Sequence, residues 1–280
     1  MKRNTGISWA SETWNCIHGC NKMSEGCNIC FACLLTYNKE HGNSESGKGL
    51  PFKGMGLTFP SLDSNGFPRW TGKVVLTKDP KLLNEPLRWK TPKMIFANSM
   101  YDIFHPNVRL EWIQKIFSVC RQAHWHYFQF LTKRSERMLK LDPHIDWPPN
   151  LIMGVSIEND RWVQRADDLR AIGAAKKYLS LEPLIGAIPS LDLTGIDQAI
   201  VGGESGPGFR PMEISWVEEI LGKCRASGTA FYLKQDAALR AGKQGRFVDR
   251  PDLWLHEWPE PRPGEHQFRS LIAEMKKEKK

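Results

Sequence analysis

Five of the seven cysteines of this chain lie close together, in the stretch CIHGCNKMSEGCNICFAC from Cys16 to Cys33. Isolated cysteines are most often buried and inert, a description that fits Cys120 and Cys224 on apolar helix faces. It does not fit the clustered cysteines, because Gly, Asn and Ser interrupt them as they would not interrupt core sequence. An odd number of cysteines also argues against a complete disulfide framework. We therefore expect the segment to bind a metal.

The spacing of these cysteines is compatible with two kinds of metal centre. Zinc needs four ligands in a closed tetrahedron, which Cys16, Cys20, Cys27 and Cys30 could supply. An iron–sulfur cluster also takes thiolates, and Cys20, Cys27 and Cys30 could hold three irons and leave the fourth iron open. Cys33 adds a further CxxC step, so the spacing alone does not select the ligands.

The composition is that of a soluble globular protein with a basic surface. The chain has 280 residues, 41% of them hydrophobic and 25% charged, and a net charge of +8. No apolar run approaches the roughly 20 residues of a membrane span, and the N-terminus lacks the apolar core of a secretory signal. We therefore expect a cytoplasmic protein with no membrane contact. The positive charge suits a nucleic-acid partner, although a generally basic surface and the tail at 276–280 would explain it too.

Apolar, strand-like runs alternate with helix-like segments along most of the chain. The runs read as near-continuous apolar stretches, which is typical of parallel strands covered by helices. We expect strands within 7–10, 73–77, 93–99, 126–134, 151–159, 176–184, 198–206 and 229–235. The pattern predicts an α/β fold, as a full or partial TIM-like (β/α) barrel with parallel strands; a doubly wound open sheet is the alternative.

The barrel is expected to occupy residues 1–236 as one domain. It contains the cysteine motif at 16–33 and a Gly-, Ser- and Pro-rich stretch at 40–72, which we interpret as an irregular insertion. The main helices are expected at 108–123 and at 214–227, the latter ending at Gly228. Residues 237–280 form a C-terminal extension with a basic tail.

Six consecutive strands are followed by charged, amide or hydroxyl side chains. In a parallel barrel the carboxyl ends of the strands converge on one face, where the active site lies. The alternative is that polar residues merely mark where strands end. The side chains concerned are Asn98, Ser99, Thr132, Lys133, Arg134, Glu158, Asn159, Glu182, Glu204, Ser205, Lys234 and Gln235.

A set of motifs spans residues 6–236 in one order and resembles an uncharacterised phage and bacterial three-cysteine-motif family. That family is similar to radical S-adenosylmethionine proteins. The sequence departs from the family pattern in having Cys16 in place of proline, Phe31 in place of tyrosine, and the additional Cys33. The motifs are GISWASETWN (6–15), the cysteines, SMYDIFH (99–105), FQFLTKRSERM (128–138), GVSIEND (154–160), LSLEPLIG (179–186), IVGGESGPGFRPM (200–212) and FYLKQ (231–235).

The resemblance implies a [4Fe–4S] cluster held by Cys20, Cys27 and Cys30. Its open iron would bind the amino and carboxylate groups of S-adenosylmethionine, and an external electron donor would reduce it. VGGESG at 201–206 resembles the glycine-rich strand end that contacts the cofactor's amino group in such enzymes. The cofactor would then meet Gly202, Gly203, Glu204 and Ser205, and a tight turn is the alternative reading of this stretch.

The remaining polar residues at the strand ends complete the predicted site. Glu158 and Asn159 could bind the ribose hydroxyls of the cofactor. Glu182 lies in an otherwise apolar run and needs a cationic partner, for which Lys133 and Lys234 are candidates. Lys133, Glu182 and Lys234 are the candidate catalytic residues. The alternative is that Glu182 and its lysine partner form a structural ion pair at the rim of the barrel. The candidate substrate-binding residues are Arg134, Asp102 and Gln235.

Two functions follow from these features. The first is a radical S-adenosylmethionine enzyme with an iron–sulfur cluster, which modifies or repairs a nucleotide or nucleic acid. A peptide or a small metabolite is an alternative substrate. The second function is that of a zinc-bearing, non-catalytic nucleic-acid-binding protein of a phage or mobile element, working with a partner encoded nearby.

Overall fold

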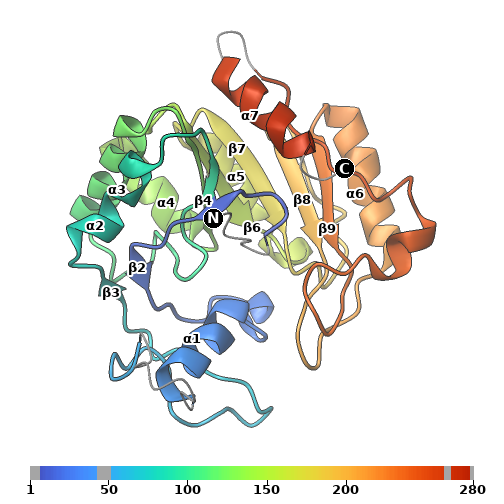
Figure 1. The fold of residues 1–280 in the computed structure, drawn as a ribbon. Coiled ribbons are helices and arrows are strands. Elements are labelled where there is room, and N and C mark those ends of the chain that lie inside the picture. Colours follow the sequence, from blue (N-terminus) through green and yellow to red (C-terminus); the bar gives the residue numbers. More distant parts are fainter. Residues whose placement is uncertain (1–6, 43–51, 262–265, 278–280) are drawn as a thin grey trace.

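A curled sheet of seven parallel strands forms the frame of the protein (Figure 1). The computed structural model describes residues 7–42, 52–261 and 266–277. The strand order is β1-β4-β5-β6-β7-β8-β9, and each neighbouring pair is parallel. The strands are β1 (Glu12–Thr13), β4 (Met94–Phe96), β5 (Tyr127–Thr132), β6 (Leu151–Ser156), β7 (Lys176–Leu181), β8 (Gln198–Gly202) and β9 (Ala230–Gln235).

The strand order decides between the two predicted architectures. The strands follow one another across the sheet in chain order, so the order never reverses as it does in a doubly wound sheet. No pairing joins β9 to β1 within the described part of the chain. The predicted α/β fold with parallel strands is therefore confirmed, and its curled sheet is that of a partial TIM-like barrel.

Two of the eight predicted strands are wrong in position. Residues 7–10 form a turn, and the first strand begins later, at Glu12. The run at 73–77 contributes only β3 (Val75–Leu76), which pairs antiparallel with β2 (Ile17–His18) in a separate small sheet. Both residues of β3 are only half-buried, whereas a strand inside a parallel sheet is covered on both faces.

Helices cover the outer face of the sheet. On α3 (Leu110–Gln122), Ile113, Ile116, Phe117 and Cys120 are buried against the sheet, and Leu110 at its first turn is half-buried. α6 ends as predicted at Gly228, whose φ of 73° is the left-handed conformation that glycine adopts readily. The covering helices are α3 (Leu110–Gln122), α4 (Ser135–Leu141), α5 (Gln164–Ala171) and α6 (Ile214–Ser227).

The end of the C-terminal extension packs against the inner face of the sheet. Its helix α7 (His266–Lys277) inserts Phe268, Leu271 and Ile272 into a core formed with inward-facing side chains of the strands. The basic tail lies outside the described residues beyond Lys277. Because α7 fills the inner face at one end of the strands, the cavity described below lies toward the other end.

The cysteine segment and the insertion cross the carboxyl ends of the strands. The segment leads through the 3₁₀ turn η1 (Glu25–Cys27) into α1 (Phe31–His41). Of the insertion, residues 43–51 lie outside the described residues, and 52–72 hold a single bridge between Thr58 and Trp70. The buried Glu40 carboxylate of α1 accepts hydrogen bonds from the backbone N–H groups of Leu57 and Thr58. Those bonds fasten the insertion to α1.

Shorter elements connect these parts. No helix within residues 7–42, 52–261 and 266–277 has the length and apolar character needed to cross a membrane. The connecting elements are α2 (Pro80–Leu83), η2 (Glu85–Arg88), η3 (Asp142–His144), η4 (Asp160–Trp162) and η5 (Gly245–Asp249).

Candidate metal and cofactor site

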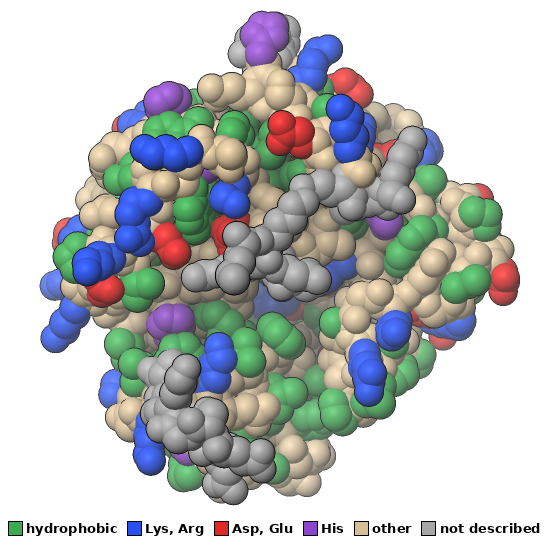
Figure 2. Space-filling model, viewed as in Figure 1, with side chains coloured by type: hydrophobic (Ala, Val, Ile, Leu, Met, Phe, Trp, Pro, Cys, Tyr) green, Lys and Arg blue, Asp and Glu red, His purple; other side chains and the backbone are tan. Residues whose placement is uncertain are grey.

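A cavity of about 300 Å³ lies at the carboxyl ends of the strands. The molecular surface is hollowed between the lobe that carries α1 and the rest of the molecule, and hydrophobic side chains border the hollow (Figure 2). Small side chains line its inner wall, because Ser156 and Ser180 occupy the inward positions of β6 and β7 there. The strand ends therefore meet at an open site, as expected for a parallel barrel.

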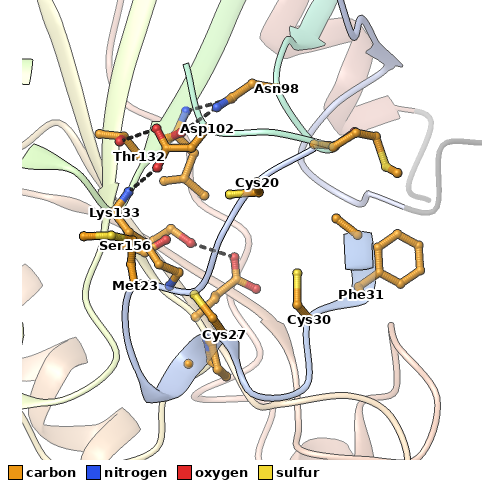
Figure 3. Close-up of a pocket in the computed structure, with 18 of the residues that line it drawn as sticks. Cys20, Met23, Cys27, Cys30, Phe31, Asn98, Asp102, Thr132, Lys133 and Ser156 are labelled. Carbon is orange, nitrogen blue, oxygen red and sulfur yellow. Dashed lines mark hydrogen bonds between the residues drawn. The ribbon is translucent and has the colours of Figure 1, made fainter. Parts of the chain in front are cut away.

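Three cysteines line this cavity: Cys20, Cys27 and Cys30. Their sulfur atoms surround a common space, across from Ser156 and Lys133 at the strand ends (Figure 3). The other two cysteines of the segment lie elsewhere. Cys16 is fully buried in the outer core, and the Cys33 thiol donates a hydrogen bond to Pro68 O at 3.4 Å.

Gly19 shapes the backbone at the start of the cysteine segment. Gly19 has φ of 100°, in the region that favours glycine, and a Cβ there would lie 2.1 Å from Lys73 O. This turn directs the chain out of β2 and places Cys20 at the cavity. Cys30 then stands at the N-cap of α1 and lines the cavity, whereas the Cys33 thiol, one turn later, is bound to Pro68 O.

Arg134 and Asp102 attach the segment around Cys20 to the barrel. Arg134 Nη1 donates to Asp102 Oδ2 at 2.7 Å, and Arg134 Nη2 donates to Asn21 Oδ1 at 2.7 Å. Arg134 Nη1 also points at Cys20 Sγ, 3.9 Å away. The Asp102 carboxylate accepts further hydrogen bonds from Thr132 Oγ1 and from the backbone N–H of Lys133. Arg134 and Asp102 thus hold the cysteine loop; both also line the cavity, and their predicted substrate-binding role stays a prediction.

Glu158 makes a second attachment, near Cys27. Its carboxylate is fully buried, accepts a hydrogen bond from Ser24 Oγ at 2.5 Å and pairs with Arg165 Nη1 at 3.0 Å. Lys133 Nζ forms a second ion pair with the same carboxylate. A Cβ at Gly26 would lie 2.5 Å from Glu158 Cγ, so the turn can approach the barrel this closely only with glycine.

Asn159 and Arg210 also bind the cysteine turn, through Glu25. Asn159 Nδ2 donates to Glu25 Oε1 at 2.9 Å, and Arg210 Nη2 donates to Glu25 O at 2.9 Å. Neither Glu158 nor Asn159 lines the cavity. The structure therefore gives these two residues a positioning role, where contacts with a cofactor ribose were predicted.

The glycine-rich strand end at 201–206 is packed against protein atoms. A Cβ at Gly202 would lie 2.6 Å from Glu182 Oε1, and one at Gly203 would lie 2.2 Å from Ala237 N. The Glu204 carboxylate is buried and bound by Arg210, which donates through Nε at 2.9 Å. The glycines thus make room for this chain's own atoms, although the lining of the cavity includes Gly203, Glu204 and Ser205.

The side-chain amide of Gln235 also binds groups of this chain. Its Nε2 donates to Gly203 O at 2.8 Å, and its Oε1 accepts from the backbone N–H of Gly242 at 2.8 Å. Both ends of the amide are therefore bound to backbone groups. Gln235 braces the loops after β8 and β9; it also lines the cavity, and its predicted substrate-binding role stays a prediction.

Glu182 and Lys234 form an ion pair in the wall of the cavity. Lys234 Nζ lies 2.7 Å from Glu182 Oε1, and the Ser180 hydroxyl donates to Glu182 Oε2 at 3.2 Å. Of the two predicted partners of Glu182, the structure thus selects Lys234, while Lys133 pairs with Glu158. Both members of the pair line the cavity.

The cysteine thiols are held in a poorly solvated environment. Burial raises the pKa of Cys20 to about 12, against the opposing effect of the Arg134 guanidinium. Burial also raises the pKa of Cys30, and the nearby Cys27 adds to that shift. These thiols would give up their protons readily only to a strong cation. In the described residues, no group of three or more His, Cys, Asp or Glu side chains is arranged to hold one metal ion.

Several residues of the site were not predicted from the sequence. Ser24, Gly26, Arg165 and Arg210 make contacts that join the cysteine turn to the barrel. Arg165 lies on α5, and nothing in its local sequence distinguishes it from a surface arginine. Gly26 carried a signal, since glycine is favoured where the backbone closely approaches another group.

Residues 4–276 match the model of a family described as protein of unknown function DUF5131. The chain belongs to this family. The description of the family names no activity, cofactor or substrate. No curated protein and no solved structure matches the chain. The similarity to radical S-adenosylmethionine proteins thus stays a prediction.

Proposed function

We propose that the protein is a radical S-adenosylmethionine-type iron–sulfur enzyme that modifies or repairs a nucleotide or nucleic acid. The observation that carries the proposal is the grouping of Cys20, Cys27 and Cys30 around one cavity at the carboxyl ends of the strands. Cys16 and Cys33, which spacing could not exclude, have their sulfur atoms elsewhere. Three grouped thiols are the donor set of a cluster that keeps one iron free of cysteine.

The donor set fits a cluster in its chemistry and in its arrangement. Iron–sulfur clusters are held by cysteine thiolates, and in a [4Fe–4S] cluster each thiolate binds a different iron. The ligands must therefore surround a volume, whereas the ligands of zinc meet at one point. Cys20, Cys27 and Cys30 would hold the cluster. When bound, it supplies an electron and an open iron at which S-adenosylmethionine is reductively cleaved.

The residues around the thiols would keep the cysteine loop in place and tune its charge. Arg134 directs an N–H toward the Cys20 sulfur, which stabilises the negative charge of a thiolate. The Trp70 side chain interacts favourably with the charged form of Cys30. The Glu158 and Asp102 attachments fix the loop, so little ordering would be needed when the cofactors bind.

The substrate is proposed to enter the same cavity, opposite the cysteines. Ser156, Ser180, Glu182 and Lys234 line that side, and none of them is used to hold the cysteine loop. The net charge of +8 supports an anionic substrate such as a nucleotide or nucleic acid.

Anaerobic purification followed by reconstitution with iron and sulfide tests the proposal. We expect a brown protein with about four irons per chain, and formation of 5′-deoxyadenosine from S-adenosylmethionine after reduction. The Cys27→Ser variant should lose both iron and product. Cys33→Ser is the matched control, because Cys33 belongs to the same segment but turns away from the cavity; it should retain both.

Two other results would reject the enzyme proposal. A colourless protein with one zinc per chain, whose zinc is lost in Cys27→Ser, would favour the non-catalytic nucleic-acid-binding function. Anaerobic protein that takes up neither metal would reject both functions. Equal loss of iron in Cys27→Ser and Cys33→Ser would contradict the assignment of the three ligands.

A further inference from the structure

Apart from the charged residues that hold the cysteine loop and the loop after β8, the lining of the cavity includes the charged pair Glu182 and Lys234. Along the inward face of the sheet, Ser156 and Ser180 leave the space that larger side chains fill closer to α7. Glu182 and Lys234 project into this space from β7 and β9, with 13% and 23% of their side-chain surfaces exposed. The pair is thus accessible from the cavity, yet shielded from bulk solvent.

The pair retains hydrogen-bonding capacity for a ligand. An ammonium group carries three N–H donors, and the contact with Glu182 accounts for at most one of those of Lys234. A carboxylate has about four acceptor positions: Glu182 Oε2 accepts from Ser180 at 3.2 Å, and the buried Oε1, 2.7 Å from Lys234 Nζ, accepts no hydrogen bond among the described residues. Free donors and free acceptors therefore lie side by side, without any need to separate the two charges.

The other walls suit a flat, apolar ring. Trp9, Phe96, Trp70 and Met100 line the cavity, so aromatic and thioether groups flank the polar end. Trp9 is 2% exposed, and its indole N–H has no acceptor among the residues that the structure describes. A buried donor without an acceptor is costly, and a ligand carbonyl or ring nitrogen could satisfy it.

We propose that Glu182 and Lys234 together bind the neutral lactam edge of a nucleobase, the –NH–CO– group found in uracil, thymine and guanine. The ring N–H donates to the Glu182 carboxylate, and the adjacent carbonyl accepts from the Lys234 ammonium. Trp9, Phe96 and Met100 pack around the ring. The inference rests on the function proposed above, because it takes this cavity to be the substrate site and makes the base itself the bound group.

The pair has no net charge, because the carboxylate of Glu182 and the ammonium of Lys234 cancel, and it therefore favours neutral ligands over charged ones. A phosphate or carboxylate would be attracted by Lys234 but repelled by Glu182. A protonated amine would be attracted by Glu182 but repelled by Lys234. A neutral group with a donor beside an acceptor satisfies both partners at once. Enzymes that act on a base within nucleic acid bind it in this way, through its pairing edge and between apolar side chains.

Direct binding of nucleosides to the full-length, anaerobically purified protein tests the inference. We expect isothermal titration calorimetry to detect uridine, and to show binding of N3-methyluridine weakened roughly 10- to 100-fold, because the methyl group removes the ring donor. Glu182→Gln and Lys234→Met should weaken uridine binding by a similar factor and reduce the preference over N3-methyluridine. Lys140→Met is the control, because Lys140 is exposed on α4 and does not line the cavity.

The inference is overturned if uridine fails to bind at millimolar concentration, if the two nucleosides bind equally, or if both cavity variants bind like the wild type. Circular dichroism confirms that each variant is folded, so that lost binding is not lost structure. The assay reads binding alone, so it separates this inference from the proposed function. If the protein assembles no cluster but still binds uridine selectively, the inferred nucleobase site is supported and the proposed enzyme function is rejected.

Discussion

Replacing Glu158 with glutamine should destabilise the protein, because it removes a fully buried charge that has two cationic partners. The Glu158 carboxylate is fully buried and contacts Arg165 at 3.0 Å, Lys133 and the Ser24 hydroxyl. At 3.0 Å and an effective dielectric constant of about 20, the gross attraction to Arg165 is about 5.5 kcal/mol. Glutamine would leave two cations facing each other without a counter-charge.

The variant should lose less free energy of unfolding than this gross attraction, because the neutral amide of glutamine costs less to bury than the carboxylate. Removing one partner of a buried ion pair costs about 3–5 kcal/mol, which is the loss expected for Glu158→Gln. Urea unfolding followed by tryptophan fluorescence measures it. The control is Asp146→Asn, which breaks the pair with Arg121 at a side chain that is 87% exposed and should cost less than about 1 kcal/mol.

A second measurement separates loss of the attachment from general destabilisation. Glu158 binds Ser24 in the turn that precedes Cys27, so the variant should release that turn. In metal-free protein under native conditions, a thiol reagent should modify Cys27 faster in Glu158→Gln than in Asp146→Asn. A loss of stability equal to that of the control, with unchanged thiol reactivity, would refute the reasoning that Glu158 holds the cysteine turn.

Three further outcomes are expected. Burial lowers the pKa of His126 from 6.5 to about 4, so the contribution of the neutral imidazole to the free energy of unfolding is complete above pH 6.5 and is lost as the pH falls toward 4. Urea unfolding across that pH range should therefore show a smaller drop in stability for His126→Gln than for the wild type. Gly203→Ala should cost about 1–3 kcal/mol in urea unfolding, because the added Cβ would lie 2.2 Å from Ala237 N. Gly222→Ala in α6 is the control: its Cβ would contact no neighbouring atom, and alanine should stabilise the helix by about 0.5–1 kcal/mol. Phe268→Ala should cost about 3–5 kcal/mol by the same measurement, because this fully buried ring of α7 packs on the inner face of the sheet, and an unchanged midpoint would contradict that packing.

The sequence alone determined the features that depend on local pattern. Near-continuous apolar runs, such as that at 151–156, predicted parallel strands because both of their faces are buried. Gly228 marked the end of α6 because glycine readily adopts the left-handed conformation found there. The run at 73–77 looked the same locally, yet it pairs with β2 outside the barrel, since strand pairing depends on distant partners.

Only the tertiary structure decided which polar residues face the cavity and which hold the loop over it. Glu158 and Glu182 both follow an apolar strand, but Glu158 is enclosed by Ser24, Lys133 and Arg165, while Glu182 stays accessible beside Lys234. Ser24 and Glu158 are 134 positions apart in the chain, and no local rule specifies that contact. A side chain's function at this site depends on what packs against it, and those neighbours are brought together only when the sheet curls and the cysteine segment crosses its end.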